Sequence, residues 1–309
     1  MFALKLSHQD QLRLTGDCGA VQQFAMKLIV SVAQSRRVTE LVDIQQAHLV
    51  GSYHSGPANL SLLGFLSQQH TQVSVPSTLN ASTQDLFQGA ATDPSPTMCS
   101  TSQVINCYRQ LGCEPTLTCA PYHLERTPQF GENIAWAESN AVVYANSVIG
   151  ARTNMTVQYL DLCAAITGRM PKFGLYLDEN RRGQVVYRLD KIPPHWLEED
   201  AFFQLLGFHI GRHCGQKIPV LVGLPTDTHV DRLRSLGAAA ASSGQVQMFH
   251  AVGLTPEADS LEQALHGQLN TPSFEVIPED IHQALDLLGG PATQNINTVC
   301  LGTPHFSYD

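Results

Sequence analysis

Residues 119–183 crowd thiol, carboxylate, amide and guanidinium groups into otherwise apolar sequence. Cys119 ends a β-prone run just before a proline turn, where its thiol could face a cleft. The spacing of Glu138 and Asn146 predicts that both share one face of a helix, and Ser139 aligns with Asn146 almost as well. Buried polar groups are costly unless they pair with one another or with a ligand. The segment therefore indicates either a structural polar network or a ligand site.

Three arginine-bearing turns follow, at Arg152, at Arg169 and at Arg181 with Arg182. The planar guanidinium group suits the capture of a carboxylate through two parallel hydrogen bonds. The three turns together could form an anion pocket, while ordinary surface salt bridges are the alternative for each arginine taken alone.

Two histidines lie on turns rich in glycine or proline, where a general acid or base would be accessible: His54 and His305. Cys300 lies close to His305, and a thiolate beside a second donor suits a metal or an iron–sulfur centre. The chain has no Cys-x-x-Cys, His-Glu-x-x-His, Gly-x-Ser-x-Gly or glycine-rich phosphate motif. Hydride transfer, phosphoryl transfer and serine hydrolysis therefore have no support in the sequence.

The elements that position these groups differ between the two parts of the chain. In the first part, periodicity predicts a helix over 19–34, short strands within 45–55 and 72–80, and a helix over 103–111 that follows a loop at 93–102. Longer loops separate these elements. We expect residues 1–217 to form a mixed α/β domain that carries most of the substrate site.

The last third of the chain alternates strands and helices. Strands are predicted at 218–223, 246–252, 274–277 and 297–301, with helices at 226–236, 260–266 and 279–288 between them. Such a series favours a doubly wound parallel sheet, in which ligands gather at the carboxyl ends of the strands. We therefore expect a parallel α/β domain over 218–309 that this chain leaves incomplete.

Composition excludes several classes of protein. The chain has 309 residues, of which 15% are charged and 43% hydrophobic, so it is typical of a compact globular protein. Its net charge of −9 and its lack of basic clusters predict no binding to nucleic acid or to an anionic membrane. No apolar run is long enough for a membrane helix and no export signal opens the chain, so we expect a cytoplasmic protein with mostly reduced cysteines.

Residues 131–183 resemble the large subunit, or catalytic domain, of the aconitase X family. The family pattern Gly-Glu-x-Ile-Ala-Trp-Ala-Glu-Ser-Asn-Ala, followed by Gly-Ala-Arg-Thr-Asn and Asp-Leu-Cys-Ala-Ala-Ile-Thr-Gly-Arg, is present here nearly unbroken. The likeness extends to residues 16–26, 47–51, 75–80, 118–122 and 301–305. It implies an aconitase-like α/β fold.

The resemblance also implies a hydro-lyase that dehydrates cis-3-hydroxy-L-proline or mevalonate 5-phosphate with an iron–sulfur cluster held by three cysteines. Cys119 and Cys300 match two of these ligands, and the position of the third lies beyond Asp309. The family further uses a small swivelling domain, fused or separate, so we expect a small partner subunit. The segments at 52–54 and 179–183 look more like the hydroxyproline branch. A phosphomevalonate dehydratase and a truncated, non-catalytic scaffold or binding subunit are the alternatives.

On this resemblance each site residue has an expected role. Glu138 and His54 are candidates for the proton base, with a residue of the swivelling domain as an equal competitor. Arg152 and Arg182 would hold the substrate carboxylate. The remaining substrate-binding candidates are Asn80, Ser139, Asn140, Thr153 and Asn154.

Overall fold

The computed structural model describes residues 4–68, 70–82, 96–268, 270–290 and 298–299. The chain divides into two compact units: Met1–Val142 with Ala151–Asn180, and Val143–Gly150 with Arg181–Asp309. The sequence analysis places a boundary near Lys217, but the structure places the division earlier. The reason is that strand β6 (Val185–Arg188) pairs with β7 (Pro219–Val222), and helix α7 (Asp200–Cys214) packs against α8 (Val230–Gly244).

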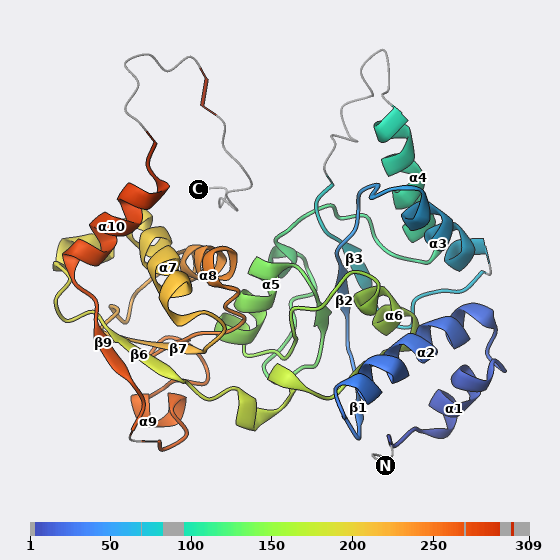
Figure 1. Cartoon of the computed structure of the whole chain (residues 1–309), viewed down its shortest axis with the longest axis horizontal. Helices are drawn as coiled ribbons and strands as arrows, with labels where there is room; N and C mark the ends of the chain where they lie inside the picture. The colour runs from blue at the N-terminus through green and yellow to red at the C-terminus, as the bar shows by residue number, and fades with distance from the viewer. Residues whose placement is uncertain (1–3, 69, 83–95, 269, 291–297, 300–309) are drawn as a thin grey trace. The chain divides into compact units, whose positions relative to one another are not determined.

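The first unit is built on a parallel sheet with the strand order β3-β2-β4 (Figure 1). Strand β2 (Ala47–Leu49) pairs with β3 (Ser77–Leu79) on one side and with β4 (Ala135–Trp136) on the other. Strands β2 and β3 lie within the two segments predicted as strands. An antiparallel pair, β1 (Leu41–Asp43) with β5 (Arg169–Pro171), completes the strands of the unit.

Helices cover this sheet. Helix α6 (Leu160–Thr167) is buried along its whole length and contacts β2, and α2 (Ala20–Ser35) packs against α6. Small and apolar side chains in α6, such as Ala164 and Ala165, allow this close approach. Helix α2 confirms the prediction for 19–34, whereas α4 begins before its predicted start at residue 103. The other helices are α1 (His8–Thr15), α3 (Pro57–Gln68), α4 (Pro96–Gln110) and α5 (Ser139–Tyr144).

The second unit has a parallel four-stranded sheet of order β8-β7-β6-β9. Its remaining strands are β8 (His250–Ala251) and β9 (Ser273–Glu275), and its remaining helices are α9 (Leu261–Ala264) and α10 (Pro278–Leu288). The predicted strand at 297–301 falls almost wholly outside the described residues. Short helical turns are found in the two units at Pro121–His123, Gly174–Tyr176, Asp178–Asn180 and Pro194–Glu198.

Both faces of the central strands β6 and β7 of this second sheet are buried. Val185 and Tyr187 of β6 join the core formed with α7 and α8, whereas Val186 and Val220 pack with Ala264 of α9 on the opposite face. Figure 1 shows α7 and α8 on one side of the sheet and α9 on the other. Alternate residues of a strand point to opposite faces, so helices on both sides explain why the central strands β6 and β7 are largely apolar. The α/β, doubly wound arrangement predicted from the sequence is confirmed.

No helix in the described ranges combines the length and the apolar character needed to cross a membrane.

Candidate functional site

A hydrogen-bonded carboxylate lies at the carboxyl ends of the first unit's parallel strands. Asn80 directly follows β3, and Glu138 follows β4 after one residue. Asn80 Nδ2 donates to Glu138 Oε2 at 2.8 Å, and the Ser139 hydroxyl donates to Glu138 Oε1 at 3.2 Å. The two donors fix the orientation of a part-buried carboxylate. The structure thus brings three sequence-predicted site residues together in an arrangement suited to proton transfer.

Asn140 holds the loop that carries Cys119. The Asn140 side chain is 5% exposed; its Nδ2 donates to the Cys119 carbonyl at 2.7 Å, and its Oδ1 accepts from the Tyr122 hydroxyl at 2.8 Å. Burial, and then the negative charge of Glu138, raise the pKa of the Cys119 thiol. This cysteine is half-buried and lies close enough to the carboxylate for the two groups to interact.

A soft thiolate such as that of Cys119 is the ligand type that iron–sulfur clusters use. Cys300, its predicted partner, and His305 lie outside the described residues. Within the described ranges, no group of three or more histidine, cysteine, aspartate or glutamate side chains gathers as a metal site. Of the two cysteines that match the family's ligands, Cys119 is the one that the structure describes.

His48 is a site residue that the sequence analysis did not select. It lies in the middle strand β2, fully buried, with its ring 6.2 Å from that of Trp136. His48 Nδ1 and the Thr78 hydroxyl oxygen form a 2.7 Å hydrogen bond. Burial lowers the pKa of His48 to about 4, so the ring is neutral near pH 7. The parallel register aligns His48 with Thr78 and Trp136, and the family likeness over residues 47–51 is the sequence signal that includes it.

Two candidates near the site form hydrogen bonds within the protein. The Thr153 side chain is fully buried, and its hydroxyl donates to the Trp136 carbonyl at 3.0 Å. Asn154 Nδ2 donates to the Phe173 carbonyl at 3.0 Å, while its Oδ1 accepts from the Leu175 backbone at 2.8 Å. Through these hydrogen bonds, Thr153 and Asn154 hold the backbone near the site, at Trp136 and at Phe173 with Leu175.

The two arginines expected to hold a carboxylate belong to different units. Arg152 of the first unit pairs with Asp178 and donates to the Tyr176 carbonyl at 3.3 Å. Arg182 is a part-buried residue of the second unit. Its neighbour Arg181 is fully buried, where it pairs with Glu257.

Glu138 and Asn146 do not lie in one continuous α-helix, which is what their spacing predicts: Glu138 directly precedes α5. Helix α5 ends at Tyr144 and continues as a π-helix over Ala145–Ile149, which changes the angular spacing of the side chains. The hydrogen bonds of Asn146 go to Arg181 and Gln247 of the second unit. His54 is part-buried in the turn before α3, and among the described residues no hydrogen bond reaches its ring.

Two family models match the chain. The model described as the aconitase X first domain matches residues 3–179, and the aconitase X second domain matches residues 183–286. Together they cover most of the chain, and they meet close to the division between the two compact units.

Several curated proteins are similar over nearly the whole chain. Cis-3-hydroxy-L-proline dehydratases of Pseudomonas aeruginosa and Hypocrea jecorina are each 36% identical over 98% and 99% of this chain and 52% of their own length. This chain thus spans about half the length of these two relatives. The phosphomevalonate dehydratase large subunit of Thermococcus kodakarensis is 32% identical over 98% of this chain and 74% of its own length.

A solved structure agrees with these matches. The crystal structure of Thermococcus kodakaraensis aconitase X in its holo-form superposes with a TM-score of 0.81 at 30% identity, over 92% of this chain and 69% of that chain.

Proposed function

The chain belongs to the aconitase X family, and from this premise we propose that it forms the larger part of a hydro-lyase that dehydrates cis-3-hydroxy-L-proline. The observation that carries the proposal is the position of the Glu138 carboxylate. Asn80 and Ser139 hold it by hydrogen bonds, and it is close enough to Cys119 for its charge to raise the pKa of the thiol. The choice of substrate rests on the greater identity to the hydroxyproline dehydratases, 36% against 32% for a phosphomevalonate dehydratase large subunit.

The reaction requires a base, a group that binds the carboxylate and an electrophile at the hydroxyl. A base removes the proton on the ring carbon next to the carboxylate, the C3 hydroxyl departs as water, and the resulting enamine tautomerises to pyrroline-2-carboxylate. Hydroxide is a poor leaving group, so it needs a proton or a Lewis acid.

Glu138 is our candidate for the base. Its two carboxylate oxygens accept hydrogen bonds from Asn80 and Ser139. These bonds would fix the orientation of the carboxylate while it removes the substrate proton. His54 remains the second candidate within this chain, and a residue of the swivelling domain competes with both. Glu138 acts close to Cys119, whose loop Asn140 fixes in place.

Arg152 and Arg182 are proposed to bind the substrate carboxylate, with Thr153 and Asn154 as positioning residues. For Arg152 to do so, the substrate must replace or share Asp178, which is 78% exposed and therefore free to move away. An iron–sulfur cluster held by Cys119, Cys300 and a third ligand would supply the Lewis acid that polarises the hydroxyl.

A small swivel-domain subunit is the proposed partner. The support is that the phosphomevalonate dehydratase relatives at 32% identity are large subunits, which implies a smaller one. The same relatives make mevalonate 5-phosphate the second candidate substrate.

The test is anaerobic co-purification of the chain with the small subunit, followed by iron–sulfur reconstitution and turnover of each candidate substrate. We expect pyrroline-2-carboxylate from cis-3-hydroxy-L-proline and no turnover of mevalonate 5-phosphate. The reverse result would assign the second substrate. Absence of both products, with no iron retained, would support a non-catalytic scaffold.

Two matched pairs of variants test the residue roles in the same complex. Glu138→Gln should lower kcat at least 100-fold, the usual scale of general base catalysis, while Glu132→Gln should not. Cys119→Ala should reduce the bound iron and Cys18→Ala should not, because Cys18 lies in the turn between α1 and α2 beside Gln9. Full turnover by Glu138→Gln would refute its role as the base.

A further inference from the structure

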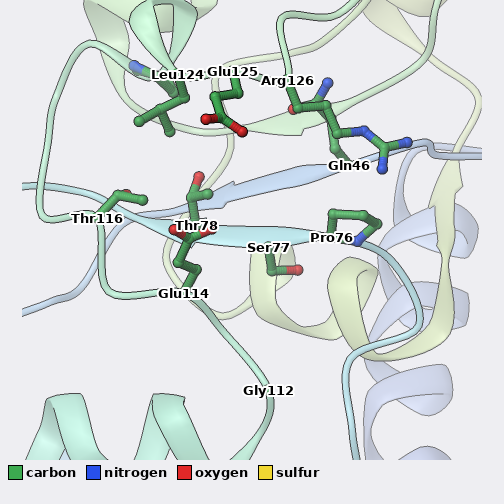
Figure 2. A pocket seen from close by; sticks show the side chains of 11 residues that line it. Gln46, Pro76, Ser77, Thr78, Gly112, Glu114, Thr116, Leu124, Glu125 and Arg126 are labelled. Carbon is green, nitrogen blue, oxygen red and sulfur yellow. The ribbon is translucent and has the colours of Figure 1, made fainter.

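A second polar cavity, of about 420 Å³, lies in the first unit (Figure 2). Gln46 precedes β2 and Pro76 precedes β3, so the cavity reaches the amino ends of these two parallel strands, whereas Asn80 follows the carboxyl end of β3 and Glu138 follows β4. Neither of those two residues lines it, nor does Cys119. The cavity therefore does not include the Glu138 cluster, although Thr78, which bonds to His48, is part of its lining.

Gln46 is the buried polar group of this cavity. The residue is 7% exposed, and among the described residues its side-chain Nε2 has no hydrogen-bond acceptor. A buried amide N–H without an acceptor costs about 1–3 kcal/mol, a cost that a bound acceptor would remove. The backbone of Gln46 cannot move freely to relieve it, because its carbonyl accepts from the Ala135 backbone at 2.9 Å.

Charged side chains of both signs line the same cavity: Arg126, Glu114 and Glu125. Within the described part of the chain none of the three forms an ion pair. Figure 2 shows the Glu125 carboxylate pointing toward the strand that carries Thr78. The cavity thus offers a cation and an amide donor for an anion, and two carboxylates for a cation.

We propose that this cavity binds a small aliphatic α-amino acid in its zwitterionic form. Arg126 and the Gln46 amide would receive the carboxylate, and Glu114 and Glu125 would receive the ammonium group. A lone anion would meet two carboxylates, and a lone cation would meet Arg126, so a ligand with both charges fits best.

An apolar wall accounts for the aliphatic side chain. Pro76, Pro121 and Leu124 line the cavity together with the charged residues, and they give a short hydrocarbon group a surface to cover. A polar or charged side chain would find fewer partners there.

The experiment is isothermal titration calorimetry of the full chain with L-leucine as the probe, at concentrations up to about 10 mM. We expect saturable binding that isocaproate and isoamylamine do not reproduce at the same concentrations, because each lacks one of the two charges. Arg126→Gln should weaken L-leucine binding about tenfold, the usual effect of losing one charge-assisted hydrogen bond. Arg212→Gln, a change at another arginine outside the cavity, should leave it unchanged.

Gln46→Leu is the second variant, because it removes the buried amide that would bind the carboxylate. A thermal melt of this variant verifies that it still folds. Absence of L-leucine binding, or binding that survives both Arg126→Gln and Gln46→Leu, would overturn the proposal. Binding that is lost in Glu138→Gln would also overturn it, since the amino acid would then occupy the dehydration site. The measurement needs no turnover, so it is independent of the proposed dehydratase activity.

Discussion

The Arg181–Glu257 pair gives the sharpest prediction about the stability of the second unit. Arg181 is fully buried, and its Nε lies 3.0 and 2.9 Å from the two carboxylate oxygens of Glu257. Its Nη1 donates to Asn146 Oδ1 at 3.1 Å, and its backbone carbonyl is 2.7 Å from His250 Nε2. Glu257→Gln would leave this cation buried without its counter-ion.

Removal of one partner of a buried ion pair costs about 3–5 kcal/mol, because the remaining charge stays desolvated. Glu257 is 18% exposed, so water can partly replace the lost carboxylate, and we expect the lower end, about 3 kcal/mol. That amount is a large fraction of the ~5–15 kcal/mol that stabilises a domain.

The matched control is Asp200→Asn in the same unit. Asp200 also pairs with an arginine, with its Oδ1 2.8 Å from Arg232 Nε, but its side chain is 84% exposed. Solvent screens such a pair, so we expect the variant to unfold at nearly the parent urea midpoint.

The assay is urea unfolding followed by tryptophan fluorescence. The chain has two tryptophans, Trp136 in the first unit and Trp196 in the second, so a Trp136→Phe background lets Trp196 report on the second unit alone. The reasoning is refuted if Glu257→Gln shifts the midpoint no more than Asp200→Asn does.

Other predictions concern pH and packing. Burial raises the pKa of Asp161 to about 6 from 3.8, so its stabilising contribution is full below pH 3.8 and lost as pH rises through 6. Relative to Asp161→Asn, the parent should gain about 2 kcal/mol between pH 7 and pH 4 in urea titrations, and a flat difference would contradict this. His48 has the opposite sign: its pKa of about 4 lies below 6.5, so relative to His48→Gln the parent should lose stability as pH falls from 6.5 toward 4. Gly211→Ala should destabilise the protein by about 1–3 kcal/mol, because the added Cβ would lie 2.1 Å from Ser243 Oγ. Gly64→Ala, in helix α3 with open space around it, should instead stabilise the protein by about 0.5–1 kcal/mol. Equal urea midpoints of the two variants would refute the packing argument.

Local pattern was sufficient for several elements. The run of apolar residues over 19–34 predicted α2, and the alternation after residue 218 predicted strands β7, β8 and β9 with helices α8, α9 and α10. Within α2, Ala25 and Ile29 are buried, but the apolar Phe24 is 37% exposed. Helical periodicity specifies an apolar stripe, whereas the shape of the neighbouring α6 selects which part of it is covered.

Strand β6 shows where local pattern failed. Its four residues, Val185–Arg188, follow a polar turn and form too short a run to be recognised alone. Pairing with β7 on one side and β9 on the other makes β6 a central strand of the second unit. The division between the units therefore comes before β6 and not at Lys217. Pairing between segments distant in sequence is decided by the whole fold rather than by four residues.

The candidate site divides in the same way. Residue types and the family resemblance selected Asn80, Glu138, Ser139, Asn140 and Cys119, and the structure connects them by hydrogen bonds or by charge. Sequence alone determined the α/β class, the family and the chemical character of this cluster, because these depend on composition, periodicity and motif. Tertiary structure decided that Thr153 and Asn154 support the backbone, that His48 is buried and neutral, and that Gln46 faces a second cavity. Those outcomes depend on which partners lie within a few ångströms, and the chain sets that distance only when it folds.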